Sequence, residues 1–368
     1  MQIFPRIVAT AKTVLRRLGL LPLVGRLLAR LLALGDRVPA AKPLAHFIRH
    51  AQEQASFVGV TDVHDLPPIH HYWSNTYLLP KVRQFGFASP DEFFANHLER
   101  SLEVGRTSRF LSIAAGNCDT EIRVAEVLRS RGHERFVIEC LDLNAAMLGR
   151  GRDAALRRGL SAQLAWVEAD FNAWRPQGRY DAIIANQALH HVAGLEHLFD
   201  AVAQAIAGHG RFVISDMIGR NGHLRWPEAL AIVQEFWREL PHSHRYNHQL
   251  RRREPAFLDW DSSVSGYEGI RAQDILPLLI ERFQFEVFVP FANVIDPFIG
   301  RAFGPNFDPA IPWDREFIDR VHARDEQELL AGRLKPTHVF AVVQTQPPDA
   351  RQYLEGFRPE KSVRPPIH

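Results

Sequence analysis

Short apolar runs and helical patterns alternate along the middle of the chain. Five largely apolar runs, at 110–114, 136–141, 165–167, 180–185 and 211–215, read as strands. Between them, apolar residues recur every three or four positions at 121–131, 145–158 and 195–207. Strands that alternate with helices at this spacing predict crossover units, and therefore a parallel sheet with helices packed on it.

A polar residue ends or closely follows four of these runs. Asp142 ends the second run, Asp170 follows the third, Asn186 the fourth and Asp216 the fifth. The carboxyl ends of parallel strands lie at one edge of a sheet, and open α/β sheets bind their ligands there. The sequence therefore predicts a binding site at this edge.

The turn after the first run is the centre of the predicted site. Residues 109–121, RFLSIAAGNCDTE, pass from an apolar strand through small residues into a helix. Small side chains let backbone N–H groups approach a ligand, and Asp119 or Thr120 can cap the helix. Only Gly116 remains of the three glycines in a dinucleotide fingerprint, so an ordinary tight turn is the alternative interpretation.

The segment before the first run is dense in histidine, aromatic residues and proline. It covers residues 65–98, and Ser89 followed by Pro90 predicts the start of a helix with Ser89 as its cap. Aromatic side chains near polar groups suit a lid over a pocket, and they also suit an interface between helices. Both interpretations stay open at this point.

The chain beyond the fifth run is less regular. An insertion at 217–269 contains a helical core at 227–240, and a further helix is expected at 271–283. Strands are expected at 285–291 and 337–345, with an irregular segment between them. The Pro-rich, charged tail after Pro347 is expected to lie on the surface or to be disordered. The predicted division is an N-terminal arm (1–60), a lid (61–104), a core (105–216), a cap insertion (217–270), the end of the core (271–346) and a tail (347–368).

Composition places the chain among ordinary globular proteins. Of its 368 residues, 46% are hydrophobic and 23% are charged, which is enough for a sizeable core without cross-links. The two cysteines, Cys118 and Cys140, both lie in core-like segments, which predicts buried, reduced thiols in a reducing compartment.

Charge is concentrated at the N-terminus. Nine of the first 50 residues are Lys or Arg and one is acidic, whereas the net charge of the whole chain is +2. The remainder is therefore mildly acidic, and it lacks the basic stripe that a general nucleic-acid binder carries on its folded body. We expect no nucleic-acid partner.

The apolar, basic stretch at 14–34 has several interpretations. Arginines and a proline interrupt it, so it contains no uninterrupted apolar run long enough to span a membrane. A helix that packs on the body is one interpretation, and peripheral contact with an anionic membrane surface is another. A transit or signal peptide is a third, without a convincing cleavage site. We expect a cytoplasmic protein, with attachment to the inner face of a membrane as the alternative.

Several motifs together resemble the class I S-adenosylmethionine-dependent methyltransferases. They are LSIAAGNCDTE, ECLDLNAAM, WVEADFN, YDAIIANQALHHV and GRFVISDMIG. The resemblance covers residues 105–220, and residues 271–345 match the family's closing antiparallel strands less tightly. It implies a Rossmann-like α/β fold with a seven-stranded, mostly parallel sheet and helices on both faces, an N-terminal helical extension and an inserted cap. It also implies S-adenosyl-L-methionine as the cofactor.

The resemblance assigns roles to the residues at the strand ends. The methionine end of the cofactor falls on the first turn, the ribose on Asp142 and the adenine near Asp170, while Asn186 lies beside the sulfonium. The implied cofactor-binding residues are Ala114, Ala115, Gly116, Asn117, Asp142, Leu143, Met147, Asp170, Phe171 and Asn186.

The sequence also departs from the family pattern. Ser112 stands where strand one usually carries an acid, and Ala114 and Cys118 stand where glycines are expected. We expect a negative φ at Ala114, since it carries a Cβ.

Candidate catalytic residues follow the fourth run. Methyl transfer from a sulfonium mainly requires in-line placement of the acceptor, and a hydroxyl acceptor also requires loss of its proton. His190 and His191 stand where they can take that proton, or else cap and pack beneath the next helix. Further candidates are Asp216, Glu268, Arg271, Tyr72 and Trp73. No metal site is expected, because His242, His244 and His248 have no acid or cysteine at a regular ligand spacing.

The function expected from the sequence is methyl transfer to a small or medium-sized acceptor, such as a hydroxyl on a glycan, a lipid-linked intermediate or a natural product. A non-catalytic scaffold that binds the cofactor is the alternative. A nicotinamide dehydrogenase would require the glycine triplet that is absent. The acceptor, the methylated atom and the oligomeric state do not follow from the sequence.

Overall fold

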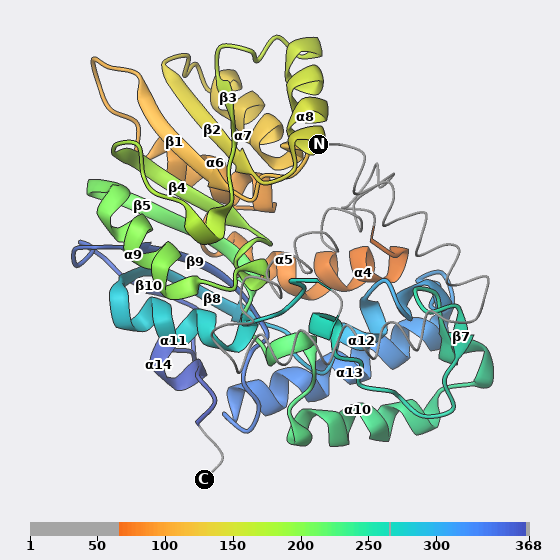
Figure 1. Ribbon diagram of the computed structural model, residues 1–368. Helices are drawn as coiled ribbons and strands as arrows, with labels where there is room; N and C mark the ends of the chain where they lie inside the picture. Colours follow the sequence, from red (N-terminus) through yellow and green to blue (C-terminus); the bar gives the residue numbers. More distant parts are fainter. Residues whose placement is uncertain (1–65, 265, 366–368) are drawn as a thin grey trace, which may run out of the picture.

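The fold is known from a computed structural model, which describes residues 66–264 and 266–365 (Figure 1). The N-terminal arm at 1–60, including the stretch at 14–34, lies outside the described residues. Within the described ranges, no helix is both long enough and apolar enough to cross a membrane.

A mixed β-sheet forms the centre of the molecule. Its strand order is β10-β8-β9-β5-β4-β1-β2-β3, and β9 runs antiparallel to both of its neighbours while the other pairs are parallel. The strands are β1 (Ser108–Ile113), β2 (Phe136–Asp142), β3 (Leu164–Glu168), β4 (Tyr180–Asn186), β5 (Ile206–Met217), β8 (Gln284–Phe291), β9 (His338–Gln344) and β10 (Gln352–Tyr353). All seven expected strands are present, and the Rossmann-like α/β class is confirmed.

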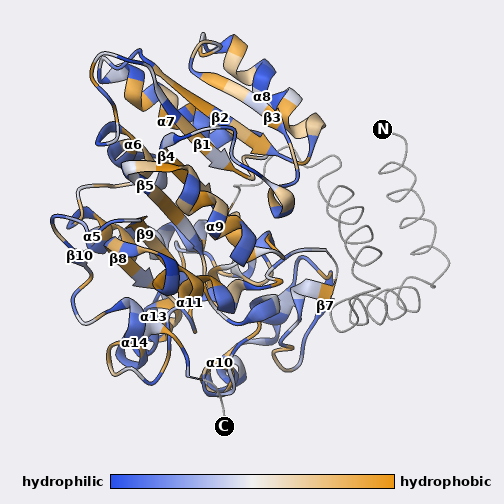
Figure 2. Cartoon of the chain, turned by 60° about the vertical axis from the view of Figure 1, so that its left-hand side comes forward, coloured by the Kyte–Doolittle hydropathy of each residue, from blue (hydrophilic) through white to orange (hydrophobic). Residues whose placement is uncertain are grey.

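Central strands are buried on both faces, which explains their continuous apolar sequences. In β4, the six residues from Tyr180 to Ala185 are all buried. The register aligns Ile113 at the end of β1 with Leu141 and Ala185 on its two neighbours. The carboxyl ends of β4, β1 and β2 therefore meet at one edge. Figure 2 shows the hydrophobic residues gathered in these strands, while the surrounding helices carry hydrophilic faces.

Helices cover both faces of the sheet. On one face α6 (Pro90–Glu99) packs against β4, β5 and α7 (Asp119–Ser130), and α7 also contacts α8 (Ala145–Arg157). The other face carries α9 (Leu195–Ala205) and α11 (Ala272–Arg282), which pack on each other (Figure 1). As expected, Ser89 caps α6: its hydroxyl accepts a hydrogen bond from the backbone N–H of Glu92, and Pro90 is the first helical residue.

A helical layer lies beyond one end of the sheet, at the lower right of Figure 1. Aromatic residues join its helices: Phe317 packs against Phe236 and Phe298 at ring-centroid distances of 5.9 and 5.4 Å. Its helices are α4 (Pro68–Trp73), the π-helix η2 (Ser74–Leu78), α5 (Leu79–Arg83), α10 (Pro227–Glu239), α12 (Asp296–Ile299) and α13 (Pro312–Leu330).

Short elements complete the described chain. The 3-10 helices are η3 (Phe171–Ala173), η4 (Leu189–His191), η5 (Asn221–His223), η6 (His242–Arg245), η7 (Ser262–Val264) and η8 (Gly304–Asn306). A small hairpin pairs β6 (Tyr246–Asn247) with β7 (Arg252–Arg253), and α14 (Pro359–Ser362) is the last helix.

Two expectations about the C-terminal part are wrong. The sheet has eight strands rather than seven, because β10 in the tail pairs with β8, and the N–H of Leu354 donates to the carbonyl of Phe288 at 2.9 Å. The tail thus contains regular structure, in β10 and α14. The segment between β8 and β9 is not irregular throughout, since it contains the 19-residue helix α13. Its buried face includes Asp314, Asp325 and Glu328, which obscured the apolar periodicity.

Candidate active site

The turn between β1 and α7 has a left-handed backbone at three of five residues. The φ angles of Ala114, Gly116 and Cys118 are +54°, +56° and +59°. The expected negative φ at Ala114 is therefore wrong: the turn keeps the conformation that glycine favours, although two positions carry a Cβ. Left-handed backbone costs an L-residue about 1–2 kcal/mol. The N–H of Ala115 donates to the carbonyl of Leu141 at 3.0 Å, which ties the turn to β2.

The Asp142 carboxylate joins the first turn to the second. It lies at the tip of β2 with a 7% exposed fraction. One carboxylate oxygen accepts the backbone N–H of Gly116 at 2.9 Å, and the other accepts that of Asn144 at 2.8 Å. The side chain of Asn144 in turn caps α8. The carboxylate is therefore held in one orientation between two turns, and it does not point into solvent.

Met147 and Gly116 lie against each other in the same place. A Cβ on Gly116 would stand 3.2 Å from the terminal methyl carbon of Met147, and the φ of Gly116 is positive. Met147 is buried, while Leu143 packs on the core with part of its surface exposed. The turn and the start of α8 thus form a close-fitting corner, where the positive φ favours glycine and a Cβ would require the methyl group of Met147 to shift by a few tenths of an ångström.

A carboxylate from α7 reaches the position where strand one lacks an acid. Glu121 is 2% exposed and accepts a hydrogen bond of 2.5 Å from the hydroxyl of Ser112 in β1. Burial raises the pKa of Glu121 to about 7. The sequence shows that Ser112 stands where strand one usually carries an acid. It does not show that Glu121, nine residues later, supplies a carboxylate to this position.

The two cysteines lie beneath this turn. Both Cys118 and Cys140 are buried thiols, as the sequence predicts. A hydrogen bond with Cys118, together with burial, raises the pKa of Cys140 well above its usual value. Gly151 of α8 packs closely against the turn, because a Cβ there would stand 2.9 Å from the sulfur of Cys118 and 2.8 Å from the carbonyl oxygen of Asn117.

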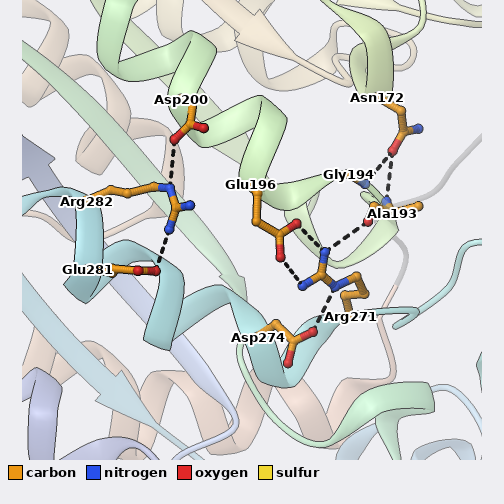
Figure 3. Close-up of polar contacts among 9 residues, drawn as sticks. All are labelled: Asn172, Ala193, Gly194, Glu196, Asp200, Arg271, Asp274, Glu281 and Arg282. Carbon is orange, nitrogen blue, oxygen red and sulfur yellow. Dashed lines mark hydrogen bonds and ion pairs between the residues drawn. The ribbon is translucent and has the colours of Figure 1, made fainter.

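The loop after β3 is bonded to the loop after β4. Asp170 caps η3 by accepting the backbone N–H of Asn172 at 2.8 Å, and Phe171 beside it is 3% exposed. The amide oxygen of Asn172 accepts the N–H groups of Ala193 and Gly194 at 2.8 and 3.1 Å (Figure 3). Asn172 was missed by the sequence analysis, since nothing local marks an asparagine as a bridge between loops.

Arg271 fixes the loop after β4 from the other side. Its guanidinium pairs with Glu196 at 2.5 Å and with Asp274 at 2.8 Å, and it donates to the carbonyl of Ala193 at 3.1 Å (Figure 3). The hydrogen bonds that Arg271 donates to the carboxylate of Glu196 are the main cause that raises the pKa of Arg271. Arg271 thus stands in a set of contacts between α9 and α11.

Two further candidates lie at an interface between helices. The hydroxyl of Tyr72 donates to Asp319 of α13 at 2.9 Å, and the indole N–H of Trp73 lies 3.3 Å from Nδ1 of His322 on the same helix.

Asn186, at the end of β4, donates to the hydroxyl of Thr120 at 3.0 Å. The tip of β4 is therefore held against the start of α7.

Three histidines and Glu268 form a cluster after β4. Nδ1 of His190 lies 2.6 Å from Asp216, which is fully buried and also accepts the backbone N–H groups of Ala188, Leu189 and Met217. Nε2 of His190 and Nε2 of His191 each lie 3.6 Å from an oxygen of Glu268. Nε2 of His223 lies 2.7 Å from Glu268.

Burial and mutual charges set the ionisation of this cluster. Burial, with a contribution from His191, lowers the pKa of His190. Burial alone would raise the pKa values of Asp216 and Glu268, but both pKa values lie below the usual range. His190 lowers the pKa of Asp216. The pKa of Glu268 is lowered by His223, His191 and His190. The carboxylates are therefore anionic at neutral pH.

The histidines in the insertion that the sequence singled out do not converge. His244 pairs with Asp314 at 2.9 Å, and His248 faces Asn306 at 3.0 Å. His242 is exposed. Among the described residues, the one grouping whose ligand atoms could surround a metal ion is His190, His191 and Glu268.

Comparisons with known proteins agree with the sequence resemblance. Residues 99–254 match the sequence profile of a methyltransferase domain family. The ubiquinone/menaquinone biosynthesis C-methyltransferase of Brucella anthropi is 27% identical over 104 residues, which are 28% of this chain and 38% of that protein. The corresponding enzyme of Cellvibrio japonicus is 27% identical over 107 residues, 29% of this chain and 41% of that protein. This chain thus spans about two fifths of the length of these curated relatives.

Several solved structures with similar folds are methyltransferases, and two of them serve as examples. A geranyl diphosphate C-methyltransferase from Streptomyces coelicolor covers 70% of this chain and 76% of its own, at 13% identity and a TM-score of 0.39. An O-methyltransferase from a polyketide multienzyme of Brevibacillus brevis covers 77% of this chain and 84% of its own, at 14% identity and a TM-score of 0.41. Neither match bears on the substrate of this chain.

Proposed function

We propose that this chain, in which residues 99–254 are a methyltransferase domain of the class I, S-adenosylmethionine-dependent family, transfers a methyl group from that cofactor to a small or medium-sized acceptor. The acceptor group that we favour is a hydroxyl on a glycan, a lipid-linked intermediate or a natural product. The observation that supports this most directly is the buried Asp142 carboxylate, which is bonded to the backbone of two turns at the tip of β2.

Bound S-adenosylmethionine supplies a methyl group on a sulfonium, which is already activated for transfer. Asp142 binds the two ribose hydroxyls. A carboxylate offers about four acceptor positions, which accommodates hydroxyl donors beside backbone donors. Because Gly116 and Asn144 fix its orientation, the ribose meets a preorganised acceptor.

The neighbouring turns bind the two ends of the cofactor. Asp170 approaches the adenine amino group, and Phe171, Met147 and Leu143 provide apolar contact for the ring. The turn of Ala114, Ala115, Gly116 and Asn117 binds the methionine end through its backbone. The corner between Gly116 and Met147 fits this role, since glycine at 116 adopts the positive φ of the turn and places no side chain beside Met147.

The acceptor binds on the far side of Asn186, where the loop after β4 carries His190 and His191. We propose these two histidines as the catalytic residues. The exposed fraction of the His191 side chain is 15% and that of His190 is 4%, so the acceptor meets His191 more directly. Glu268 and His223, both from the insertion, lie beside these histidines on the same side of the site.

Calorimetry with S-adenosylhomocysteine tests the cofactor site. The wild type should bind, Asp142→Ala should lose most of the affinity, and Asp153→Ala on the exposed face of α8 should bind as the wild type does. Equal affinity in the Asp142 variant would overturn the assignment of the ribose site.

Methyl transfer is tested with labelled S-adenosylmethionine and a fractionated extract of the source cell, followed by mass spectrometry of any labelled product. His191→Ala should slow labelling while it leaves binding of S-adenosylhomocysteine intact. Binding of the cofactor without any labelled product would support the alternative, a scaffold that retains the fold and the cofactor.

A further inference from the structure

We propose that His190, His191 and Glu268 hold one divalent transition-metal ion, and that an oxygen atom of the acceptor binds to this ion. The metal site stands on the geometry of the three side chains. Its role toward the acceptor rests on the proposed methyl transfer. The proposal departs from the sequence-based expectation of no metal, because Glu268 lies in an insertion 77 residues after His191 in the sequence.

The distances among the three side chains suit a shared ion. Nε2 of His190 and Nε2 of His191 lie 3.6 Å from the two oxygens of Glu268, and one ligand atom from each residue lies within 4.8 Å of the others. A separation of 3.6 Å is too long for a hydrogen bond. Metal bonds of about 2.1 Å place neighbouring ligand atoms about 3.0–3.5 Å apart. A small contraction of the cluster would therefore complete the coordination.

His190 is oriented as a ligand by a second carboxylate. Asp216 is fully buried, lies 2.6 Å from Nδ1 of His190 and is itself held by three backbone N–H groups. A proton on Nδ1 leaves the lone pair of Nε2 directed at the cluster. Metal-bound histidines usually have such a carboxylate partner, which fixes the ring and its tautomer.

Glu268 is also held from behind. His223 lies 2.7 Å from one of its oxygens, and the segments that carry the two residues are joined by a hydrogen bond of 2.8 Å from the N–H of Gly222 to the carbonyl of Gly269. A Cβ on Gly269 would stand 3.0 Å from the His223 ring, so glycine is needed for this approach. His223 is thus a positioning residue for the carboxylate.

The ligand types indicate which metals fit. Two imidazoles and one carboxylate suit Zn²⁺, Fe²⁺, Co²⁺ or Mn²⁺, whereas Mg²⁺ and Ca²⁺ prefer oxygen ligands alone. Three protein ligands leave coordination positions open, as in catalytic sites. The ion would stand directly after the end of β4, on the acceptor side of Asn186.

This position gives the ion a defined part in the reaction. An acceptor hydroxyl that binds the ion releases its proton to solvent more readily, because the positive charge stabilises the anionic oxygen. That oxygen forms a bond to the methyl carbon while the carbon–sulfur bond breaks. The electron pair of the broken bond stays on the sulfur, and S-adenosylhomocysteine leaves as the neutral thioether.

Metal content tests the site without any acceptor. Full-length protein is stripped with a chelator and dialysed against Zn²⁺, Co²⁺ or Mg²⁺, and bound metal is then measured by mass spectrometry. We expect one Zn²⁺ or Co²⁺ per wild-type chain and none or little Mg²⁺. Affinity for Zn²⁺ should fall by at least about 100-fold in His191→Ala and in Glu268→Gln. The exposed His242→Ala should bind as the wild type does.

Several results would overturn the proposal. They are a wild type that takes up no transition metal, uptake of Mg²⁺ alone, or undiminished Zn²⁺ binding in both ligand variants. Thermal unfolding and calorimetry with S-adenosylhomocysteine show that each variant is folded, and they keep the metal question separate from cofactor binding. Full methyl transfer by the chelated enzyme, with loss of activity in His191→Ala, would instead identify His191 as a base that acts without metal.

Discussion

The hydroxyl of Ser112 donates a 2.5 Å hydrogen bond to the carboxylate of Glu121, which lies in the first turn of α7 and is 2% exposed. Strand one thus receives from the helix the acid that it lacks in its own sequence. The buried carboxylate bridges β1 and α7, the two elements joined by the turn proposed to bind the methionine end of the cofactor. Its protonation therefore matters for the stability of this part of the fold.

Stability should fall as pH rises through neutrality, and Glu121→Gln should remove this component. Burial raises the pKa of Glu121 from 4.5 to about 7, with Asp119 raising it further and Arg123 lowering it. A group with a raised pKa contributes stability that is fully present below its unfolded pKa and is lost as pH passes the folded one. The difference amounts to about 3 kcal/mol.

The measurement is the free energy of unfolding of wild type and Glu121→Gln between pH 5 and 8.5. The hydroxyl of Ser112 can still donate to the glutamine oxygen, so the variant keeps the contact. We expect a steeper loss in the wild type. Parallel curves for the two proteins would show that Glu121 does not titrate in this range.

Replacing Ala114 with glycine should stabilise the fold. Ala114 has a φ of +54°, which costs an L-residue about 1–2 kcal/mol, while glycine adds about 0.4–1 kcal/mol of unfolded-state entropy. The net gain should be about 0.5 kcal/mol in urea unfolding. Ala115→Gly at the next position, where φ is negative, is the control and should destabilise. The same sign for both changes would contradict this interpretation of the turn.

Two glycines of α8 should respond to alanine in opposite ways. A Cβ at Gly149 meets nothing within 4 Å, so Gly149→Ala should stabilise the helix by about 0.5–1 kcal/mol. A Cβ at Gly151 would stand 2.8 Å from the carbonyl oxygen of Asn117, and the crowding should cost about 1–3 kcal/mol. Calorimetry should also show weaker binding of S-adenosylhomocysteine to Gly151→Ala alone. Equal effects of the two changes would argue against a close contact between α8 and the turn.

Arg271→Ala should destabilise more than Arg282→Ala. Arg282 ends α11, Arg271 directly precedes it, and both arginines face α9 (Figure 3). Arg271 also donates a hydrogen bond to the carbonyl of Ala193 in the loop after β4. Arg282 makes partly exposed ion pairs with Asp200 and Glu281, which contribute at most about 1 kcal/mol. We expect a loss of about 1–2 kcal/mol for Arg271→Ala. Urea unfolding of both variants checks this order. The reverse order would show that the contact between Arg271 and the Ala193 carbonyl does not stabilise the fold.

The sheet and the proposed cofactor site were predictable from the sequence because both follow from local pattern. Strands buried on both faces appear as continuous apolar runs, and parallel pairing brings their carboxyl ends together. The sequence pattern alone therefore places Asp142, Asp170 and Asn186 at one edge of the sheet. Each lies there in the structure, on β2, after β3 and on β4.

Features that depend on contacts far apart in the sequence were not predictable. Helix α13 has Asp325 on its buried face, where the carboxylate accepts the backbone N–H groups of Asn293 and Val294 at 3.0 Å. An acid in that position reads as solvent-exposed in a sequence pattern. In the same way, Glu268 was a candidate on its own, but its meeting with His190 and His223 depends on how the insertion returns to the sheet.

The bond between Gly222 and Gly269 closes the base of the insertion, so the polypeptide leaves and rejoins the core at nearly the same point. The backbone N–H of Gln273 in α11 donates to the side-chain oxygen of Asn221 at 3.1 Å and anchors that base. A change in the length or composition of the loop between the two glycines therefore need not displace His223 or Glu268, which lie next to them in the sequence. Such a closed stem separates the spacing of these two side chains from the sequence of the loop, so the loop can diversify during evolution while that spacing is kept.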